Sequence, residues 1–193
     1  GERPGPGDPR LARAEYRLVA TPAMALEAAA AHARAAGYET ASLGADLEGE
    51  ARDVAREHAH AALALVREGG KPTLLLSGGE LTVTIAGAGK GGPNQEFALA
   101  LALALDGQPG VSALAADTDG ADGGSGAEDD PAGAFVFPDT LARAEAQGLD
   151  AADHLARNDS STIFGALNDL LKCGPTRTNV NDFRAVLVDT RDS

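Results

Sequence analysis

The sequence predicts an α/β protein with three layers, α/β/α, built on a mixed and mostly parallel β-sheet. Along the 193 residues, short apolar segments rich in valine, leucine and alanine alternate with longer segments of helical character. Segments in that order fold as a sheet covered by helices on both faces. Two apolar segments flank Gly78 and Gly79. Because that connection is too short for a parallel crossover, we expect the sheet to be mixed.

The N-terminal part is expected to be a linker. Residues 1–14 are rich in proline and glycine, which predicts a linker or loop from a preceding domain, and we place the α/β domain at residues 15–193. Its first predicted strand is Tyr16–Ala20. Pro22 suits the first turn of a helix that continues through alanine-rich sequence to Ala36.

The remaining elements follow from periodicity and from turn residues. The predicted strands are Tyr38–Leu43, Thr73–Leu76, Leu81–Ala86, Val111–Ala116 and Arg184–Val188, and the predicted helices are Glu50–Arg67, Asn94–Leu105, Pro138–Gln147 and Ser160–Asp169. In Ala98–Leu105, alanine and leucine alternate as in a strand, but both are strong helix formers and no β-branched residue occurs there. We therefore expect a helix, and because it is apolar on every side it should be buried. The whole pattern is Rossmann-like.

Composition argues against several classes of partner. The formal net charge is −13, whereas binding to nucleic acid or to an anionic membrane needs a basic face. No apolar run reaches the roughly 18 residues that a membrane-spanning helix needs. The single cysteine, Cys173, cannot form a disulfide within the chain and fits a reducing compartment. We expect a cytoplasmic protein, and a small phosphorylated ligand is not excluded.

Gly87–Gly92 is a glycine-rich loop between a predicted strand and a predicted helix. Its G-x-G-x-x-G spacing, with Asp117 after the next strand, is the outline of a nicotinamide-dinucleotide site. Three details argue against NAD: the preceding strand alternates, Pro93 places the last glycine before the helix, and the acidic residue comes late. The loop also lacks the serine or threonine of a Walker loop. We favour a general anion site with Lys90 as a point charge, and the alternative is a tight turn with an exposed lysine.

Asp117–Asp122 follows a predicted strand, at the edge of the sheet where open α/β folds bind ligands. Its carboxylates suit either Mg²⁺ held through water or the positioning of a substrate hydroxyl. An EF-hand is excluded, because Ala121 and Asp122 stand where a ligand and the glycine belong. We expect Asp119 to be functional, whereas Asp122 and Asp129 are expected to be loop residues.

Gly174–Asp182 is a polar segment whose apolar anchor is Val180 alone. Arg177, between two threonines and before two asparagines, suits a carboxylate or phosphate ligand. An equal alternative is a polar turn in which Asn179 and Asp182 bond to the backbone. The histidines are expected on solvated helix faces. They are His32, His58, His60 and His154.

Five motifs occur in one order along the chain: Ser77–Glu80, Gly91–Phe97, Ala116–Asp122, Ala156–Asp159 and Gly174–Asp182. Together they resemble the MOFRL domain, the C-terminal part of the class II glycerate 2-kinases. Ala45–Arg52 is similar to the stretch that precedes this domain in those enzymes. The resemblance covers nearly the whole chain from about Tyr16 onward.

The resemblance implies transfer of the γ-phosphoryl group of ATP to the 2-hydroxyl of D-glycerate, with Mg²⁺, in a cleft between two α/β domains. Phosphoryl transfer needs positioning and charge neutralisation more than covalent chemistry. The implied catalytic residues are Asp119, Lys90 and Glu80, and the implied Mg²⁺ ligands are Asp117 and Asp119. The implied substrate and nucleotide contacts are Ser77, Gly78, Gly79, Gly91, Gly92, Asn94, Glu96, Asp117, Gly120, Thr176, Arg177, Thr178, Asn179, Asn181 and Asp182.

Two further functions stay open. Some members of the family carry the name hydroxypyruvate reductase, so an NAD(P)H-dependent reductase is the second function, and a non-catalytic ligand-binding or subunit-contact domain is the third. The implied partners are D-glycerate and an N-terminal domain, and a homodimer is a further expectation. Many relatives have arginine where this chain has Pro93, so no arginine role carries over to that position.

Overall fold

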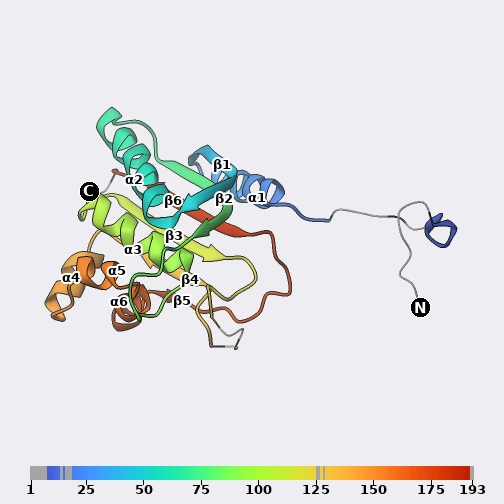
Figure 1. Cartoon of the computed structure of the whole chain (residues 1–193). Coiled ribbons are helices and arrows are strands. Elements are labelled where there is room, and N and C mark those ends of the chain that lie inside the picture. The colour runs from blue at the N-terminus through green and yellow to red at the C-terminus, as the bar shows by residue number, and fades with distance from the viewer. Residues whose placement is uncertain (1–7, 14, 16–18, 125–126, 128, 192–193) are drawn as a thin grey trace.

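The computed structural model describes residues 8–13, 15, 19–124, 127 and 129–191. A six-stranded sheet forms the centre of the protein, and helices lie on both of its faces (Figure 1). The predicted three-layer α/β/α architecture is therefore confirmed. No described helix combines the length and the apolar composition that a bilayer crossing requires.

Most elements lie close to where the sequence predicts them. The helices are α1 (Pro22–Ala35), α2 (Ala51–Glu68), α3 (Pro93–Leu105), α4 (Thr140–Ala146), α5 (Ala151–Ala156) and α6 (Ser160–Leu167), after a 3₁₀ turn η1 (Pro9–Leu11). The strands are β1 (Glu39–Glu50), β2 (Thr73–Thr82), β3 (Val111–Asp117), β4 (Gly133–Val136), β5 (Leu170–Leu171) and β6 (Asp182–Val188). The sequence does not predict α5, β4 and β5, which are short. Part of the predicted linker lies outside the described residues, namely residues 1–7 and 14. The same is true of residues 16–18 in the predicted strand Tyr16–Ala20, and the remaining Val19 and Ala20 are not in a strand.

The strand order is β1-β2-β6-β3-β4-β5. Strands β1 and β2 are parallel, whereas the β2–β6, β6–β3, β3–β4 and β4–β5 pairs are antiparallel. The sheet is mixed, as predicted. The prediction that it is mostly parallel is wrong, because all the neighbouring pairs given above except β1–β2 are antiparallel. The reason is the last strand, β6, which enters between β2 and β3 and separates two strands that run in the same direction.

Strand β2 is continuous, where the sequence predicts two strands and a turn. Gly78 and Gly79 lie within it and pair with Phe183 and Asp182 of β6. Strand β1 approaches so closely that a Cβ on Gly79 would lie 2.1 Å from the backbone oxygen of Leu47, and the φ angle of Gly79 is +108°. The glycine pair therefore permits a close approach of two strands, and the turn from which we inferred a mixed sheet does not exist.

The larger apolar cluster lies between the sheet and the helices α2, α3, α4, α5 and α6. Helix α3 is its centre, because ten of its 13 residues are buried. Leu99 and Leu101 are fully buried, and each buried leucine contributes roughly 1.5–3 kcal/mol to stability. The prediction that the alanine and leucine run forms a buried helix is confirmed.

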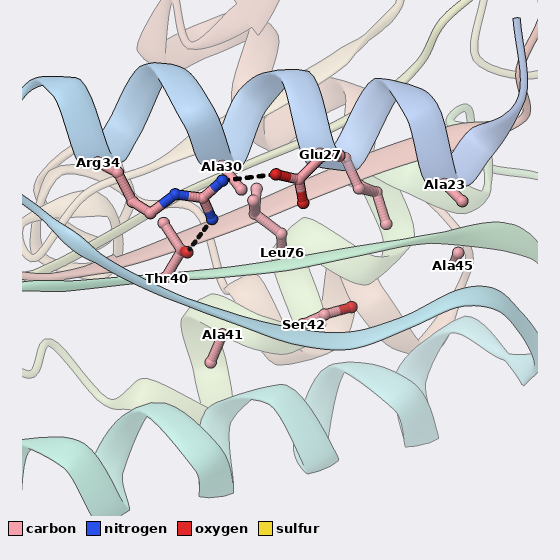
Figure 2. Close-up of a pocket in the computed structure, with 10 residues that line it drawn as sticks. Ala23, Glu27, Ala30, Arg34, Thr40, Ala41, Ser42, Ala45 and Leu76 are labelled. Atoms are coloured by element: carbon pink, nitrogen blue, oxygen red, sulfur yellow. Dashed lines mark hydrogen bonds and ion pairs between the residues drawn. The ribbon is translucent and has the colours of Figure 1, made fainter.

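Among the described residues, α1 alone covers the opposite face, over β1 and β2. Leu26 packs there against Leu76. Beside this contact, Arg34 pairs with Glu27 at 2.5 Å and donates to Thr40 at 3.1 Å, along a cavity of about 270 Å³ (Figure 2). Both charged side chains are largely exposed, so this pair adds little to stability. Helix α1 is held mainly by its apolar face.

Candidate functional site

Three loops meet at one edge of the sheet. Gly79 in β2 pairs with Asp182 at the start of β6, and Asp182 also pairs with Asp117 at the end of β3. The loop after β2, the loop after β3 and the loop before β6 therefore leave the sheet side by side. We call residues 83–92, 117–124 and 174–181 the loop edge. It is the edge at which open α/β folds bind their ligands.

Hydrogen bonds join the second and third of these loops. Thr118 Oγ1 donates to the carbonyl of Asn181 at 2.7 Å and accepts from the N–H of Val180 at 2.9 Å. The N–H of Thr176 donates to the carbonyl of Asp119 at 3.0 Å. These contacts hold the acidic loop of Asp119 against the polar loop of Arg177.

Arg177 and Lys90 are the two cations of the loop edge. Both are exposed, and within the part of the chain that the structure describes neither side chain has an ion-pair partner. The backbone of Arg177 is left-handed, with φ +61°. Such a conformation in a non-glycine residue costs about 1–3 kcal/mol, and strained residues of this kind cluster at functional sites. The other exposed members of the predicted set are Glu80, Gly91, Thr176, Thr178, Asn179 and Asn181.

Asp117 and Asp119 form the acidic part of the loop edge. The carboxylate of Asp117 accepts the N–H of Asp119 at 2.9 Å, and the carboxylate of Asp119 accepts the N–H of Ala121 at 2.8 Å. Burial raises the pKa of Asp117 to about 6, and the carboxylates of Asp119 and Asp182 add to this shift. No group of three or more histidine, cysteine, aspartate or glutamate side chains among the described residues could hold a metal ion. Two carboxylates still fit Mg²⁺, which is usually bound by one or two carboxylates, water and substrate phosphates.

The raised pKa of Asp117 predicts a pH dependence of stability. Because the folded-state pKa lies above the ordinary value, its contribution to the free energy of unfolding is full below about pH 4. That contribution is lost as the pH rises through about 6. The Asp117→Asn variant lacks this titration, so we expect the wild type to lose stability relative to the variant over this range. Urea denaturation at several pH values measures the difference, and parallel pH profiles for the two proteins would contradict the raised pKa.

The N-terminus of α3 is already filled by a carboxylate of the protein itself. Asp122 is 3% exposed, and its two carboxylate oxygens accept the backbone N–H groups of Asn94 at 2.9 Å and Gln95 at 2.8 Å. The side-chain amides of Asn94 and Gln95 donate to the same oxygens at 3.2 and 3.0 Å. In a dinucleotide-binding fold, the phosphate groups of the ligand bind at this helix N-terminus. Asp122 lies in a loop, as predicted, but it is a buried residue that anchors α3, which the sequence does not predict.

The glycine-rich loop is held by the turn that precedes α6. Asn158 Oδ1 accepts the N–H groups of Ala86 at 2.7 Å and Gly87 at 3.0 Å. Asp159 Oδ1 accepts the N–H of Lys90 at 3.1 Å, and a fourth N–H of the loop bonds to the backbone of the same turn. These four N–H groups are not free to surround a phosphate. The side chain of Lys90 is the charged group that this loop offers to an anion.

Replacing Asn158 with alanine should release the glycine-rich loop. The change leaves the N–H groups of Ala86 and Gly87 without their acceptor. We expect their amide hydrogen exchange to accelerate by about tenfold or more, because the loop then opens more often. Asn168→Ala is a matched control, because Asn168 also has a left-handed backbone but is exposed. Unchanged exchange at the loop would contradict this role of Asn158.

Four residues predicted to contact the ligand are buried and bonded inside the protein. They are Ser77, Asn94, Glu96 and Asp182. Glu96 pairs with Arg52 at 2.6 Å, and Asp182 pairs with the fully buried Arg184 while accepting from Asn94 Nδ2 at 2.7 Å. These four side chains support the loop edge from beneath, and their contact with substrate stays a prediction.

The predicted glycines are also explained by close contacts within the chain. A Cβ on Gly92 would lie 2.2 Å from the backbone oxygen of Asp122, and a Cβ on Gly120 would lie 2.2 Å from that of Gly174. These glycines let the three loops pack against one another. Their binding of substrate stays a prediction.

His58 is buried, whereas the sequence predicts that it lies on a solvated helix face. It is 3% exposed, and its ring nitrogens bond to the carbonyl of Val54 at 2.8 Å and to Ser77 Oγ at 2.7 Å. Burial lowers the pKa of His58 to about 4, so the ring is neutral near pH 7. Its helical spacing from Val54 and Ala62, both buried, is the signal that would have found it. His154 is likewise buried, whereas the other two histidines are exposed as predicted.

Comparison with known proteins gives this arrangement a family. Residues 73–182 match the MOFRL family. The chain is 47% identical over 179 residues to a protein of Agrobacterium vitis named "Putative hydroxypyruvate reductase", and 36% identical over 175 residues to the D-glycerate 2-kinase of Thermotoga maritima. These matches cover 90% and 89% of this chain, but 46% and 41% of the relatives.

Solved structures agree with the sequence comparison. The crystal structure of glycerate kinase from Thermotoga maritima is similar with a TM-score of 0.85 and 35% identity. The match covers 90% of this chain and 42% of that chain. This chain therefore spans less than half the length of these relatives.

Proposed function

Because this chain belongs to the MOFRL family, we propose that it forms one portion of a glycerate kinase, which transfers the γ-phosphoryl group of ATP to the 2-hydroxyl of D-glycerate. The loop edge is the observation that supports this proposal most strongly. In a fold similar to that of a glycerate kinase, it brings two exposed cations and a pair of carboxylates to one edge of a sheet. Opposite charges in this arrangement suit a reaction in which a phosphoryl group must be positioned and its charge neutralised.

In this proposal each exposed group of the loop edge has a role. Arg177 and Lys90 oppose the negative charge on the transferred phosphoryl group, and the hydroxyl and amide groups of residues 176–181 bind the carboxylate of glycerate. Asp117 and Asp119 would hold Mg²⁺, which supplies further charge neutralisation when bound. Asp119 has one oxygen bonded to the N–H of Ala121, so its other oxygen can hold the ion or orient the 2-hydroxyl.

The remaining portion of the longer polypeptide supplies the opposite wall of the site in this proposal. A triphosphate and a carboxylate together carry more charge than Arg177 and Lys90 neutralise, and the chain as a whole has a net charge of −13. The 193 residues should unfold cooperatively on their own, because they contain a buried core. They should not catalyse the reaction without the opposite wall of the site.

A chimaera tests this proposal. In it, the present chain replaces the matching segment of the Agrobacterium vitis relative, which is 47% identical. We expect the chimaera to form ADP from ATP when D-glycerate and Mg²⁺ are present, and the isolated chain to form none. Substantial turnover by the isolated chain would show that the site is complete without a second portion, and would contradict the proposal.

A reductase is the second candidate, and the name of the Agrobacterium vitis relative favours it. The geometry favours it less, because Asp122 fills the helix terminus at which a dinucleotide phosphate would lie. The same chimaera decides between the two. Oxidation of NADH with hydroxypyruvate, without ADP formation from glycerate, would replace the kinase proposal, and the absence of both activities would favour a non-catalytic domain.

A further inference from the structure

One face of the sheet is apolar over strands β6, β3 and β4. Among the described elements, α1 reaches only the β6 side of this face, and no helix covers it over β3 and β4. Along β6, the buried residues alternate with Phe183, Ala185 and Leu187, which are half-buried and lie on the other face. We call this surface the open sheet face. Its apolar members are Leu74, Leu114, Phe135, Phe137, Phe183, Ala185 and Leu187, and Ser112 of β3 is a polar residue among them.

The composition of the open sheet face differs from that of a solvated sheet. An antiparallel strand with one face in water normally carries polar side chains on that face. Here every outward residue within β6, from Phe183 to Leu187, is apolar, and Phe137 beyond β4 is 40% exposed. A contiguous apolar surface of this kind marks a contact site.

The open sheet face is grooved alongside α1. A cavity of about 540 Å³ lies between α1 and the sheet and is lined by Ala33, Ala36 and Leu74 among others. It continues into a cavity of about 170 Å³ lined by Leu114 and Phe135, and the two share Leu74. A helix packed beside α1 in this groove would extend the outer layer across the sheet, as the helices of three-layer α/β folds do.

We propose that the open sheet face binds an apolar helix from the portion of the longer relatives that has no counterpart in this chain. The matches cover 46% and 41% of two relatives, so more than half of each polypeptide lies outside the matching segment. A second copy of this chain is a poorer occupant, because it would bring a net charge of −13 against an equal charge. This inference rests on the proposed function in one respect, namely that the chain works as one portion of a longer enzyme.

Cysteine labelling tests the proposal. Phe137→Cys and Leu187→Cys, each in a Cys173→Ser background, place one thiol on the open sheet face. Met24→Cys is the matched control, because Met24 is 54% exposed on α1 and does not line the groove. The rate of reaction with a bulky maleimide is measured in the isolated chain and in the chimaera. We expect both face thiols to react about tenfold or more slowly in the chimaera, with the control unchanged.

Other outcomes overturn the proposal. Equal labelling rates in the chain and the chimaera would show that the face stays open. Slow labelling of the isolated chain, together with the mass of a dimer in light scattering, would show that a second copy occupies it. If the chimaera does not fold, the labelled chain is mixed with the remaining portion of the Agrobacterium vitis relative, and unchanged rates there would also overturn the proposal.

The labelling experiment is independent of the kinase assay, because it needs neither nucleotide nor glycerate. Kinase turnover by a chimaera whose face thiols remain reactive would support the proposed function and overturn the docking site. Protection of the thiols without turnover would support the docking site and count against the kinase.

Discussion

Replacing Asp119 with asparagine should lower the turnover of the chimaera by about a hundredfold or more. Asparagine keeps an oxygen that can accept the N–H of Ala121, so the loop should retain its conformation. The variant loses only the negative charge that would hold Mg²⁺ or orient the 2-hydroxyl. A coupled assay of ADP formation measures turnover, and the free energy of unfolding of the isolated variant shows whether the fold is intact.

Asp129→Asn is the control for this prediction. Asp129 follows the same acidic loop but is exposed and lies outside the loop edge. Its replacement removes the same charge from the same region, so a general effect of charge would appear in both variants. Equal and small effects would assign the whole acidic segment to loop structure, and Asp119 would have no catalytic role.

Replacing Asp122 with alanine should destabilise the isolated chain by about 3–5 kcal/mol, because buried donors on Asn94 and Gln95 lose their acceptors. This is a large part of the roughly 5–15 kcal/mol by which a domain is stable. Urea denaturation followed by circular dichroism measures the loss. The largest structural effect of any single change at the loop edge is expected here.

Asp129→Ala serves as the reference for stability, since loss of an exposed carboxylate should change the free energy of unfolding by about 0.5 kcal/mol or less. If Asp122→Ala is as mild as this reference, the carboxylate does not anchor α3. The N-terminus of α3 would then be available to a phosphate, and the dinucleotide interpretation of the glycine-rich loop would regain its basis.

The long helices could be predicted because their signals are local. The apolar stripe of α2 and the alanine and leucine run of α3 both fix a helix without knowledge of distant segments. Strand β2 could not be predicted as one strand, because Gly78 and Gly79 resemble a turn until the close approach of β1 is known. The position of β6 between β2 and β3 is likewise a property of the whole sheet.

The candidate site was predicted in outline, and its interior was not. Motifs in the sequence identified the loops that meet at the edge of the sheet, including those of Asp119 and Arg177. Sequence could not show which polar residues face inward, because that depends on partners far along the chain. Asp122 bonds to the start of α3, and no local pattern in the sequence reveals this contact. Asp182 pairs with Arg184, and here strand alternation was an available signal, because Arg184 lies on the same face of β6 as the buried Val186.

The product of the chimaera tests the central claim most directly. Phosphorus NMR of a reaction that contains ATP, Mg²⁺ and D-glycerate distinguishes the two phosphoglycerates, because the 2-phosphate couples to a single proton on its carbon and the 3-phosphate couples to a pair. We expect ADP and 2-phosphoglycerate to appear together in equal amounts. The account is contradicted if ATP is unchanged in a folded chimaera, or if the phosphate is found on the 3-hydroxyl.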